Sequence, residues 1–400
     1  MEKEQKTITN ANEVRQNKLN VPTLRFRKFT DSWTLIPIKK LLRFQNGINA
    51  DSTKYGKGIK YISVSDILNN QYITYDCIKG LIDIDEKTFN KFIVEYGDIL
   101  FQRSSETFED IGRANVYLDK EHSATFGGFV IRGKKISDYN PLFFRYLLCT
   151  HNARKQTVRM GAGAQHYNIG QEGLEKICLY FPCLQEQQKI SDFLSAIDNK
   201  IAVQNKIISK YETLIKGIRE KIANSNWKWI KLDKLIKNGV VILNRGNIIP
   251  KHAKSDLYQY PVYSSSTQNN GLMGYNDSCM FDKELITWSI DGGGNFFYRN
   301  KHKFSVTNVC GIMQVDESAY LYRFIAEMLT YQHSKMKFDY QSKAHPSVIS
   351  TLYSLPVVTL AMQSTYCQLF IVTDKIISAE KTYLSKLKEQ KNHLLSKMFI

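Results

Sequence analysis

The segment that decides the fold is Gln185–Ile222, QEQQKISDFLSAIDNKIAVQNKIISKYETLIKGIREKI, which contains no proline and a single glycine. Its apolar residues recur at alternating steps of four and three, the spacing of one helix face and of a coiled-coil seam. The members of this stripe are Ile190, Leu194, Ile197, Ile201, Gln204, Ile208, Tyr211, Ile215, Ile218 and Ile222. A helix of about 38 residues is roughly 57 Å long at about 1.5 Å of rise per residue. Such a helix needs a partner that covers its stripe.

A second segment of the same kind lies 176 residues later and ends with TDKIISAEKTYLSKLKEQKNHLLSKMFI, Thr373–Ile400. The positions that match the first stripe are Tyr366, Phe370, Thr373, Ile377, Glu380, Leu384, Leu387, Lys391, Leu394 and Met398. Outside the stripe, Gln187 matches Gln363 and Asp198 matches Asp374. One amphipathic helix could lie on its own globular domain, but two matching helices in one chain favour pairing with each other.

The sequence before each helix is also repeated, more faintly. WTLIPIKKLL from Trp33 aligns with WKWIKLDKLI from Trp227, so the chain reads globular part, helix, globular part, helix. Short apolar runs of strand length fill both globular parts. These are IKYISVSDI, YGDILFQ and FGGFVIRG in the first, and GVVILN, YQYPVYSSS, KELITWSI and FSVTNVCGIMQV in the second. At least one helix is predicted in each, with PLFFRYLLCTHNARKQTV and AYLYRFIAEMLTYQHSKM as the candidates, and the mixture indicates an α+β fold.

Composition points to an anionic partner. The chain carries 55 Lys and Arg against 38 Asp and Glu, a formal charge of +17, which makes nucleic acid the first candidate. A lysine-rich composition with no ligand behind it is the alternative. The seven cysteines form no CxxC pair and fit free thiols in a reducing cytoplasm.

No stretch predicts a membrane span. The first residues, 1–21, are polar and charged, and we expect a flexible leader rather than a signal peptide. The segment Ala344–Thr373 lacks charged residues, but prolines and many Ser and Thr residues interrupt it. It predicts a buried strand followed by the start of a helix.

The motifs of common enzymes are missing. The nearest approach to a phosphate-binding loop, KYGKG at Lys54–Gly58, lacks the leading glycine and the hydroxyl residue. The glycine-rich stretches Gly161–His166 and Asp291–Phe297 do not have the dinucleotide-binding spacing, and the eight histidines have no metal-site spacing. NPLF at Asn140–Phe143 fits the proline-started beginning of a helix. We therefore predict a binding protein with no catalytic residue and no metal ligand.

Donor-rich residues in polar or glycine-bearing loops are the candidate contacts to DNA phosphates and base edges. In the first globular part they are Lys54, Lys57, Lys60, Arg103, Arg159, Gln165 and His166. In the second they are Arg245, Lys251, His252, Ser265, Thr267, Gln268, Arg299 and Lys301. Any one of these could be a solvated loop residue, and their recurrence in both copies is what favours a binding role.

From about residue 22 onward the chain resembles the specificity subunits of Type I restriction-modification systems. The matching stretches are PTLRFRKFTDSW followed by IKKL, GIKYISVSDI, FPCLQEQQKISDFLSAIDNKI and the final LLSKMF. The block at Phe181–Ile201 is the most specific; in the second copy Met362 replaces its glutamate.

The resemblance implies two target recognition domains separated by two long antiparallel helices that form an intramolecular coiled coil, a circular repeat with pseudo-twofold symmetry. The expected parts are a flexible leader (1–21), the first recognition domain (22–183), a first spacer helix (184–225), the second recognition domain (226–359) and a second helix (360–400). Each domain would read one half of a bipartite double-stranded DNA target, and the helices would set the spacing.

The resemblance also implies partners. Two methyltransferase subunits and two restriction subunits would join this chain in the cytoplasm, with no membrane association. S-adenosylmethionine, ATP and Mg²⁺ would be bound by those subunits and not by this chain. The remaining alternatives are a stand-alone nucleic-acid-binding adaptor and an enzyme with an unusual site in the glycine-rich loops.

Overall fold

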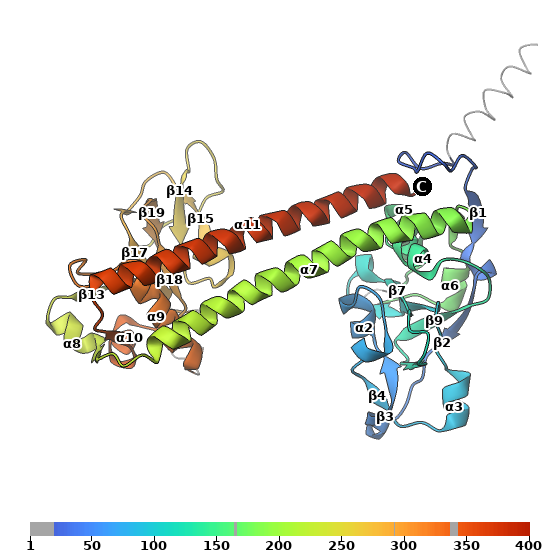
Figure 1. Ribbon diagram of the computed structural model, residues 1–400, viewed down its shortest axis with the longest axis horizontal. Helices are drawn as coiled ribbons and strands as arrows, with labels where there is room; N and C mark the ends of the chain where they lie inside the picture. Colours follow the sequence, from blue (N-terminus) through green and yellow to red (C-terminus); the bar gives the residue numbers. More distant parts are fainter. Residues whose placement is uncertain (1–19, 164–165, 292, 337–342) are drawn as a thin grey trace, which may run out of the picture. The chain divides into compact units, whose positions relative to one another are not determined.

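The computed structural model describes residues 20–163, 166–291, 293–336 and 343–400 (Figure 1). Residues 1–19 of the predicted leader (1–21) lie outside the described residues. The predicted DNA contact Gln165 also lies outside them. The chain divides into two compact units. Unit 1 comprises Met1–Gln204 and Tyr383–Ile400, and unit 2 comprises Asn205–Thr382.

Two long helices, α7 (Leu184–Ala223) and α11 (Leu360–Met398), each contribute one part to each unit. Both follow the predicted stripes, and both lack an internal proline. In unit 1 the beginning of α7 packs against the end of α11, where Ile190 and Leu194 share a core with Leu394 and Met398. In unit 2 the end of α7 packs with the beginning of α11, where Ile215 and Ile222 share a core with Phe370. The two helices are therefore antiparallel within each unit.

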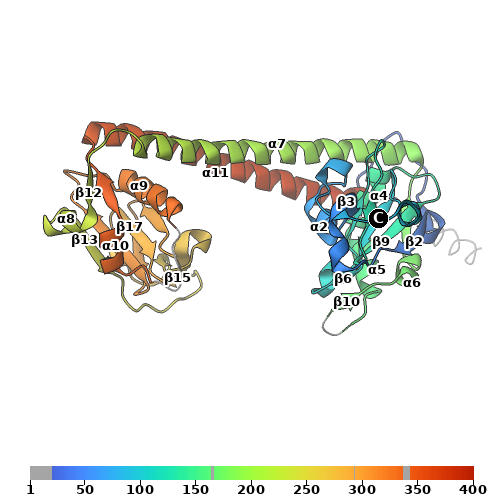
Figure 2. The ribbon, with the colours of Figure 1, turned by 90° about the horizontal axis from the view of Figure 1, so that it is seen from below.

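The first globular domain, the part of unit 1 outside the long helices, contains two main sheets. One has the order β2-β9-β5-β7 and is antiparallel; the other has the order β4-β3-β8, with β3 parallel to β8. These strands are β2 (Leu42–Asn46), β3 (Tyr55–Ile62), β4 (Leu81–Ile82), β5 (Ile99–Gln102), β7 (Ala114–Val116), β8 (Thr125–Phe126) and β9 (Val130–Lys135). Two-stranded ribbons join β1 (Thr34–Pro37) to β11 (Cys178–Phe181) and β6 (Ser104–Ser105) to β10 (Tyr167–Asn168). In Figure 2, β6 and β10 lie at the end of this domain opposite α7.

Short helices connect and cover these sheets. The α-helices are α2 (Val64–Asn69), α3 (Glu86–Lys91), α4 (Pro141–Leu148), α5 (His151–Arg159) and α6 (Gln171–Glu175). The 3-10 turns are η1 (Ile38–Lys40), η2 (Ser52–Lys54), η3 (Tyr75–Cys77) and η4 (Phe108–Asp110).

The second globular domain, the rest of unit 2, repeats the strand order of the first antiparallel sheet and adds a fourth strand to the second sheet. Its sheets have the orders β13-β20-β17-β18 and β15-β14-β19-β16, with β14 parallel to β19. The strands are β13 (Val241–Arg245), β14 (Tyr260–Tyr263), β15 (Leu272–Asn276), β16 (Phe281–Asp282), β17 (Leu285–Ser289), β18 (Phe296–Arg299), β19 (Lys303–Val306) and β20 (Cys310–Val315). A ribbon joins β12 (Trp229–Lys231) to β21 (Ser354–Pro356), as β1 joins β11. The helices are α8 (Leu232–Lys237), α9 (Tyr322–Lys335), α10 (Pro346–Leu352) and the short turn η5 (Gln268–Gly271).

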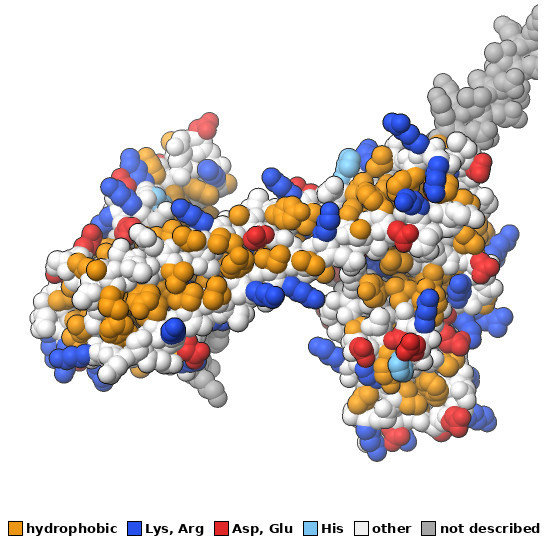
Figure 3. Space-filling model, viewed as in Figure 1, with side chains coloured by type: hydrophobic (Ala, Val, Ile, Leu, Met, Phe, Trp, Pro, Cys, Tyr) orange, Lys and Arg blue, Asp and Glu red, His pale blue; other side chains and the backbone are white. Residues whose placement is uncertain are grey.

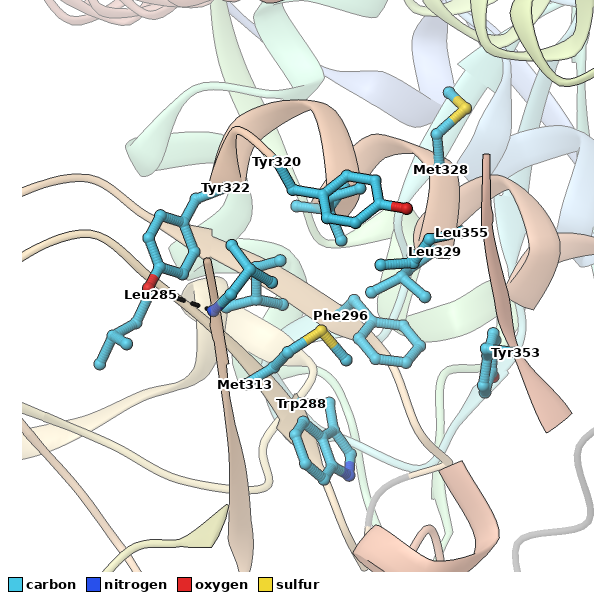
Figure 4. Close-up of a cluster of buried hydrophobic side chains, with 14 of the residues drawn as sticks. Leu285, Trp288, Phe296, Met313, Tyr320, Tyr322, Met328, Leu329, Tyr353 and Leu355 are labelled. Carbon is cyan, nitrogen blue, oxygen red and sulfur yellow. Dashed lines mark hydrogen bonds between the residues drawn. The ribbon is translucent and has the colours of Figure 1, made fainter. Parts of the chain in front are cut away.

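The core of unit 2 is built where its antiparallel sheet meets α9 (Figure 4). Trp288 from β17 is fully buried and donates its indole N–H to the Ala344 carbonyl oxygen at 2.7 Å. Gly311 lies beneath this ring, because a Cβ there would fall 2.0 Å from the Trp288 Cε2 atom. Burial of such large side chains is the main source of stability, at roughly 25 cal/mol per Å² of apolar surface.

Several local predictions are wrong in detail. The predicted strand IKYISVSDI ends at Ile62, because Ser63 and Asp66 form a capping box that starts α2. The single helix predicted over PLFFRYLLCTHNARKQTV is two helices, since the Thr150 side chain caps α5. FSVTNVCGIMQV forms two strands, β19 and β20.

The uncharged segment after Ala344 also differs from its prediction. It forms α10, the short strand β21 and the start of α11, where a strand and a helix start were expected. Proline at the first position of α10 fits the start of a helix. Within the described ranges, no helix combines the length and apolar character needed to cross a bilayer.

Candidate nucleic-acid interface

Each globular domain has a loop crossing, which we define as the place where the loop after β2 (or β13) meets the loop after β8 (or β19). In the first domain, Gly47 N–H donates to the Val130 carbonyl oxygen at 3.1 Å, and Ile48 forms a parallel bridge with Gly127. A Cβ at Gly47 would lie 2.1 Å from the Gly127 carbonyl oxygen. Only glycine permits this close approach of two backbones.

The second domain builds the same crossing from different residues. Gly246 N–H donates to the Cys310 carbonyl oxygen at 3.2 Å, and Asn247 forms a parallel bridge with Thr307. A Cβ at Gly246 would lie 2.0 Å from the Val306 carbonyl oxygen. The two crossings therefore correspond residue by residue, Gly47 to Gly246 and Gly127 to Thr307.

A predicted DNA contact sits at each crossing. Arg103 donates from Nη1 to the Gly128 carbonyl oxygen at 3.3 Å. Arg245 donates from Nε to the Asn308 carbonyl oxygen at 3.0 Å, which is the equivalent carbonyl. Arg103 comes from the end of β5 and Arg245 from the end of β13, so unrelated strands bring a guanidinium to one place. Each arginine uses one N–H on the loop, and four N–H groups remain.

Two hollows flank the crossing in the first domain. One, of about 440 Å³, is lined by polar side chains that include Gln102, Ser104 and the predicted residue His166. The other, of about 470 Å³, is lined mainly by apolar surface from Tyr55, Tyr61 and the Gly127 loop. Because Ser104 belongs to β6, the first hollow lies at the end of the domain opposite α7 (Figure 2).

Two of the three predicted lysines of the first domain lie on a strand, not in a loop. Strand β3 contains Lys57 and Lys60, and its two glycines have positive φ values. The glycine-bearing stretch predicted as a loop is therefore an irregular strand. Lys57 forms an ion pair with Asp83 at 3.2 Å, and Lys60 donates to the Tyr75 carbonyl oxygen at 2.9 Å. Lys54 ends the turn before this strand and is exposed. Arg159 is the last residue of helix α5, so its assignment to a loop was also wrong.

In the second domain, most predicted residues lie in loops and turns. Lys251 is exposed, and His252 stacks on Tyr258 with ring centroids 3.9 Å apart. Thr267 and Gln268 are exposed at turn η5, and the Ser265 carbonyl oxygen accepts a hydrogen bond from Ser289 at 2.6 Å. Lys301 is exposed in the turn between β18 and β19.

Arg299 is the exception and corrects the prediction. It is only 1% exposed, donates to Thr287 Oγ1 at 2.9 Å and stacks over the Tyr263 ring at 3.7 Å. Burial lowers the pKa of its guanidinium to about 10. Arg299 is therefore an internal residue that cannot reach DNA in this conformation, because β18 turns its side chain toward the neighbouring sheet.

The sequence did not predict a cationic hollow in the first domain. Arg113, Arg145 and Arg154 line a hollow of about 210 Å³ between α2, β7, α4 and α5. Arg154 donates to the carbonyl oxygens of Glu109 and Ile111, and burial together with the Arg113 charge lowers its pKa. These arginines come from separate elements and share no local motif, so only the tertiary structure reveals them. No cluster of three or more potential metal ligands occurs in the described parts of the chain.

Comparison with known proteins gives consistent results. A family model described as the Type I restriction modification DNA specificity domain matches residues 32–213 and again 224–357. A putative type I specificity subunit of Mycoplasma pneumoniae is 41% identical over 90 residues, 22% of this chain and 48% of that relative. A second one is 30% identical over 178 residues, 42% of this chain and 70% of the relative. The chain thus matches about half the length of the first relative.

Solved structures show the same fold. The S subunit of a Type-I restriction-modification system from M. genitalium superposes with a TM-score of 0.60 at 16% identity, covering 95% of this chain and 99% of that one. A chain from a type I R-M system, described for its complex assembly and conformational transition, superposes with a TM-score of 0.56 at 13% identity, covering 94% and 99%.

Proposed function

Starting from the fact that the chain belongs to the Type I restriction modification DNA specificity family, with one DNA-recognition domain in each unit, we propose that each domain reads one half of a bipartite double-stranded DNA target. The observation that carries this proposal is the duplicated loop crossing. Both domains hold an arginine against the equivalent carbonyl, with further N–H groups to contact phosphates or guanine edges. The cationic hollow of Arg113, Arg145 and Arg154 adds a second phosphate contact in the first domain.

The long helices would act as the spacer between the two half-sites. Helix α7 has 40 residues and runs without a break from unit 1 into unit 2, so its length is roughly 60 Å at about 1.5 Å per residue. This length exceeds one turn of DNA, about 34 Å, which is the separation of two readers on the same face of the duplex.

The same helices would dock methyltransferase subunits. Apolar side chains remain exposed on them and gather along α11 in Figure 3. Leu369, Ile371 and Val372 of α11 are 43%, 40% and 54% exposed, and Val203 of α7 is 55% exposed. Exposed apolar residues on a helix that already has a buried stripe fit a protein partner better than the DNA backbone. Two methyltransferase subunits, and with them two restriction subunits, would bring S-adenosylmethionine, ATP and Mg²⁺.

The decisive experiment combines the purified chain with a methyltransferase subunit of such a system. The chain alone should show no turnover, and the mixture should methylate adenine at one bipartite sequence. Turnover by the chain alone would support the enzyme alternative. Specific DNA binding without any methyltransferase partner would support the stand-alone adaptor instead.

The spacer role has its own test. Inserting one heptad after Asn205 in α7, with a matching heptad before Glu380 in α11, should lengthen the spacer of the target while both half-sites stay the same. A variant with the heptad in a surface loop of one globular domain is the control. An unchanged spacer in the helix variant would contradict the role of the helices.

A further inference from the structure

Each loop crossing exposes one large apolar side chain to an unusual degree. Phe129, in the loop after β8, is 70% exposed, the highest value among the large apolar side chains described in unit 1. Ile248, in the loop after β13, is 87% exposed, the highest such value in unit 2. Single exposed apolar residues are common on proteins, but here the most exposed one of each unit lies at its loop crossing.

The two side chains come from opposite loops of the same crossing. The bridges Ile48–Gly127 and Asn247–Thr307 make Asn49 the counterpart of Ile248. The Arg103 N–H donates to the Phe129 carbonyl oxygen, and the Ile290 N–H donates to the Val309 carbonyl oxygen in the same way. Val309 is therefore the counterpart of Phe129. Asn49 is polar and Val309 is partly buried. Each domain therefore presents one apolar side chain at the crossing, from whichever loop supplies it.

The backbone that carries each side chain is held in place. Around Phe129, Val130 N–H donates to the Gly127 carbonyl oxygen at 2.9 Å and Arg103 N–H donates to the Phe129 carbonyl oxygen at 2.9 Å. Just before Ile248, Asn247 N–H donates to the Val306 carbonyl oxygen at 3.0 Å. A fixed backbone with an exposed side chain is the geometry of a preorganised contact, because little freedom is lost on binding.

The surroundings of these side chains suit a base edge better than a phosphate. An apolar side chain gains nothing from a phosphate, whereas the thymine C5-methyl group is the apolar feature of the major groove. Arg103 and Arg245, at the same crossings, can meet the polar neighbours of that methyl group. We propose that Phe129 and Ile248 each contact the methyl group of a thymine in the half-site that their own domain reads. The inference rests on the proposed function of the two domains.

The test replaces thymine with deoxyuridine, which removes only the methyl group. Once the bipartite target is known, the complex of the full chain with its methyltransferase subunits is titrated with duplexes that carry one such replacement at a time. For the wild type we expect one sensitive thymine in each half-site, with binding weakened about threefold to fivefold, as for loss of one buried methyl group.

The variants assign each thymine to its reader. Phe129→Ala should abolish the sensitivity in one half-site and leave the other unchanged, and Ile248→Ala should do the reverse. Phe129→Leu, which keeps an apolar contact, should retain part of the effect. Leu35→Ala and Leu352→Ala are matched controls, since these side chains are 50% and 44% exposed on β1 and α10, away from the crossings. Both controls should behave as the wild type.

Three outcomes would overturn the inference. One is that both variants keep the wild-type sensitivity to deoxyuridine. Another is that no thymine in either half-site is sensitive while binding remains sequence-specific. The third is that 2-aminopurine in the target brightens with the wild type and not with the variants, which would make these side chains wedges between base pairs. A wild-type complex without sequence-specific binding would overturn the proposed function as well.

Discussion

The two units join their globular domain to the long helices at equivalent places but with different chemistry. In unit 1, Asp198 of α7 accepts a hydrogen bond from the Tyr146 hydroxyl at 2.8 Å and pairs with Lys391 of α11 at 2.5 Å. In unit 2, Glu327 of α9 pairs with Arg219 of α7 and Arg323 of its own helix. Arg323 also pairs with Asp374 of α11 at 2.6 Å.

One contact is identical at both junctions. Gln187 accepts from the Asn140 backbone N–H at 2.9 Å and donates to the Pro182 carbonyl oxygen at 2.9 Å. Gln363 accepts from the Leu321 N–H at 2.9 Å and donates to the Val358 carbonyl oxygen at 2.8 Å. Each glutamine thereby fixes the start of α4 or α9. The comparison teaches that the repeat keeps this glutamine contact to the backbone, while the charged side chains at the same junction differ.

The largest effect is expected from Glu327→Ala. Glu327 is 4% exposed, and its removal takes a carboxylate partner away from two partly buried arginines, Arg219 and Arg323. The free energy of unfolding of unit 2 should fall by about 3–5 kcal/mol. Hydrogen–deuterium exchange should show lost protection in α9 and unchanged protection in α4. Glu212→Ala is the control, because its pair with Lys381 is exposed and worth at most about 1 kcal/mol. Equal loss in both units would contradict separate junctions.

The two equivalent glutamines should behave as a matched pair. Gln187→Ala leaves two backbone groups without their partner. Gln363→Ala leaves three, because Gln363 also donates to the Ala319 carbonyl oxygen. Each substitution should cost about 2–3 kcal/mol. Chemical denaturation followed with probes in each unit measures both values. A difference of more than about 1 kcal/mol between them would show that the contact is not equivalent in the two units.

A smaller effect separates the units at the start of their long helices. Glu186 is fully buried and accepts two hydrogen bonds of 2.7 Å from Arg25, whereas its counterpart Met362 is 39% exposed. Glu186→Gln should cost about 1.5–2 kcal/mol, and Met362→Gln less than about 0.5 kcal/mol. Thermal unfolding of the two variants tests this, and equal shifts in Tm would contradict it.

The smallest effect concerns pH. Burial lowers the pKa of His333, whose Nδ1 lies 2.8 Å from the Tyr353 hydroxyl. In the unfolded chain, His333 has a pKa near 6.5. Just below that pH, the unfolded chain therefore binds more protons than the folded chain. Unit 2 should therefore hold its stability above about pH 6.5 and lose some as pH falls below it. His333→Gln should flatten this part of the stability profile in denaturation curves at pH 5 to 8, and an unchanged slope would contradict it.

The sequence predicted the helices and the duplication well, because their signals are periodic and local. The stripe from Ile190 to Ile222 and its match 176 residues later predicted both long helices and their partnership. The positions of helix ends were harder to predict where the side chain of a single capping residue determines them. Thr150 splits one predicted helix into α4 and α5, and Ser63 with Asp66 starts α2 within the second half of a predicted strand.

The candidate interface was predicted only in part, for a physical reason. Arg103 and Arg245 were identified as residue types, but their equivalence depends on the crossing of loops that are far apart in sequence. Sequence alone could not distinguish them from Arg299, which lies in the polar stretch YRNKHK and is nevertheless buried.

By itself, the sequence determined an α+β chain built twice, with two amphipathic helices whose apolar stripes require each other. Helical periodicity carries that information residue by residue, because burial of one face depends on spacing alone. Only the tertiary structure decided which glycines allow two loops to cross and that Arg113, Arg145 and Arg154 line one hollow. It also decided that Phe129 and Ile248 are exposed at the loop crossings of their domains. Those features arise from contacts between distant segments, whose geometry is set by the packing of sheets and not by any local pattern.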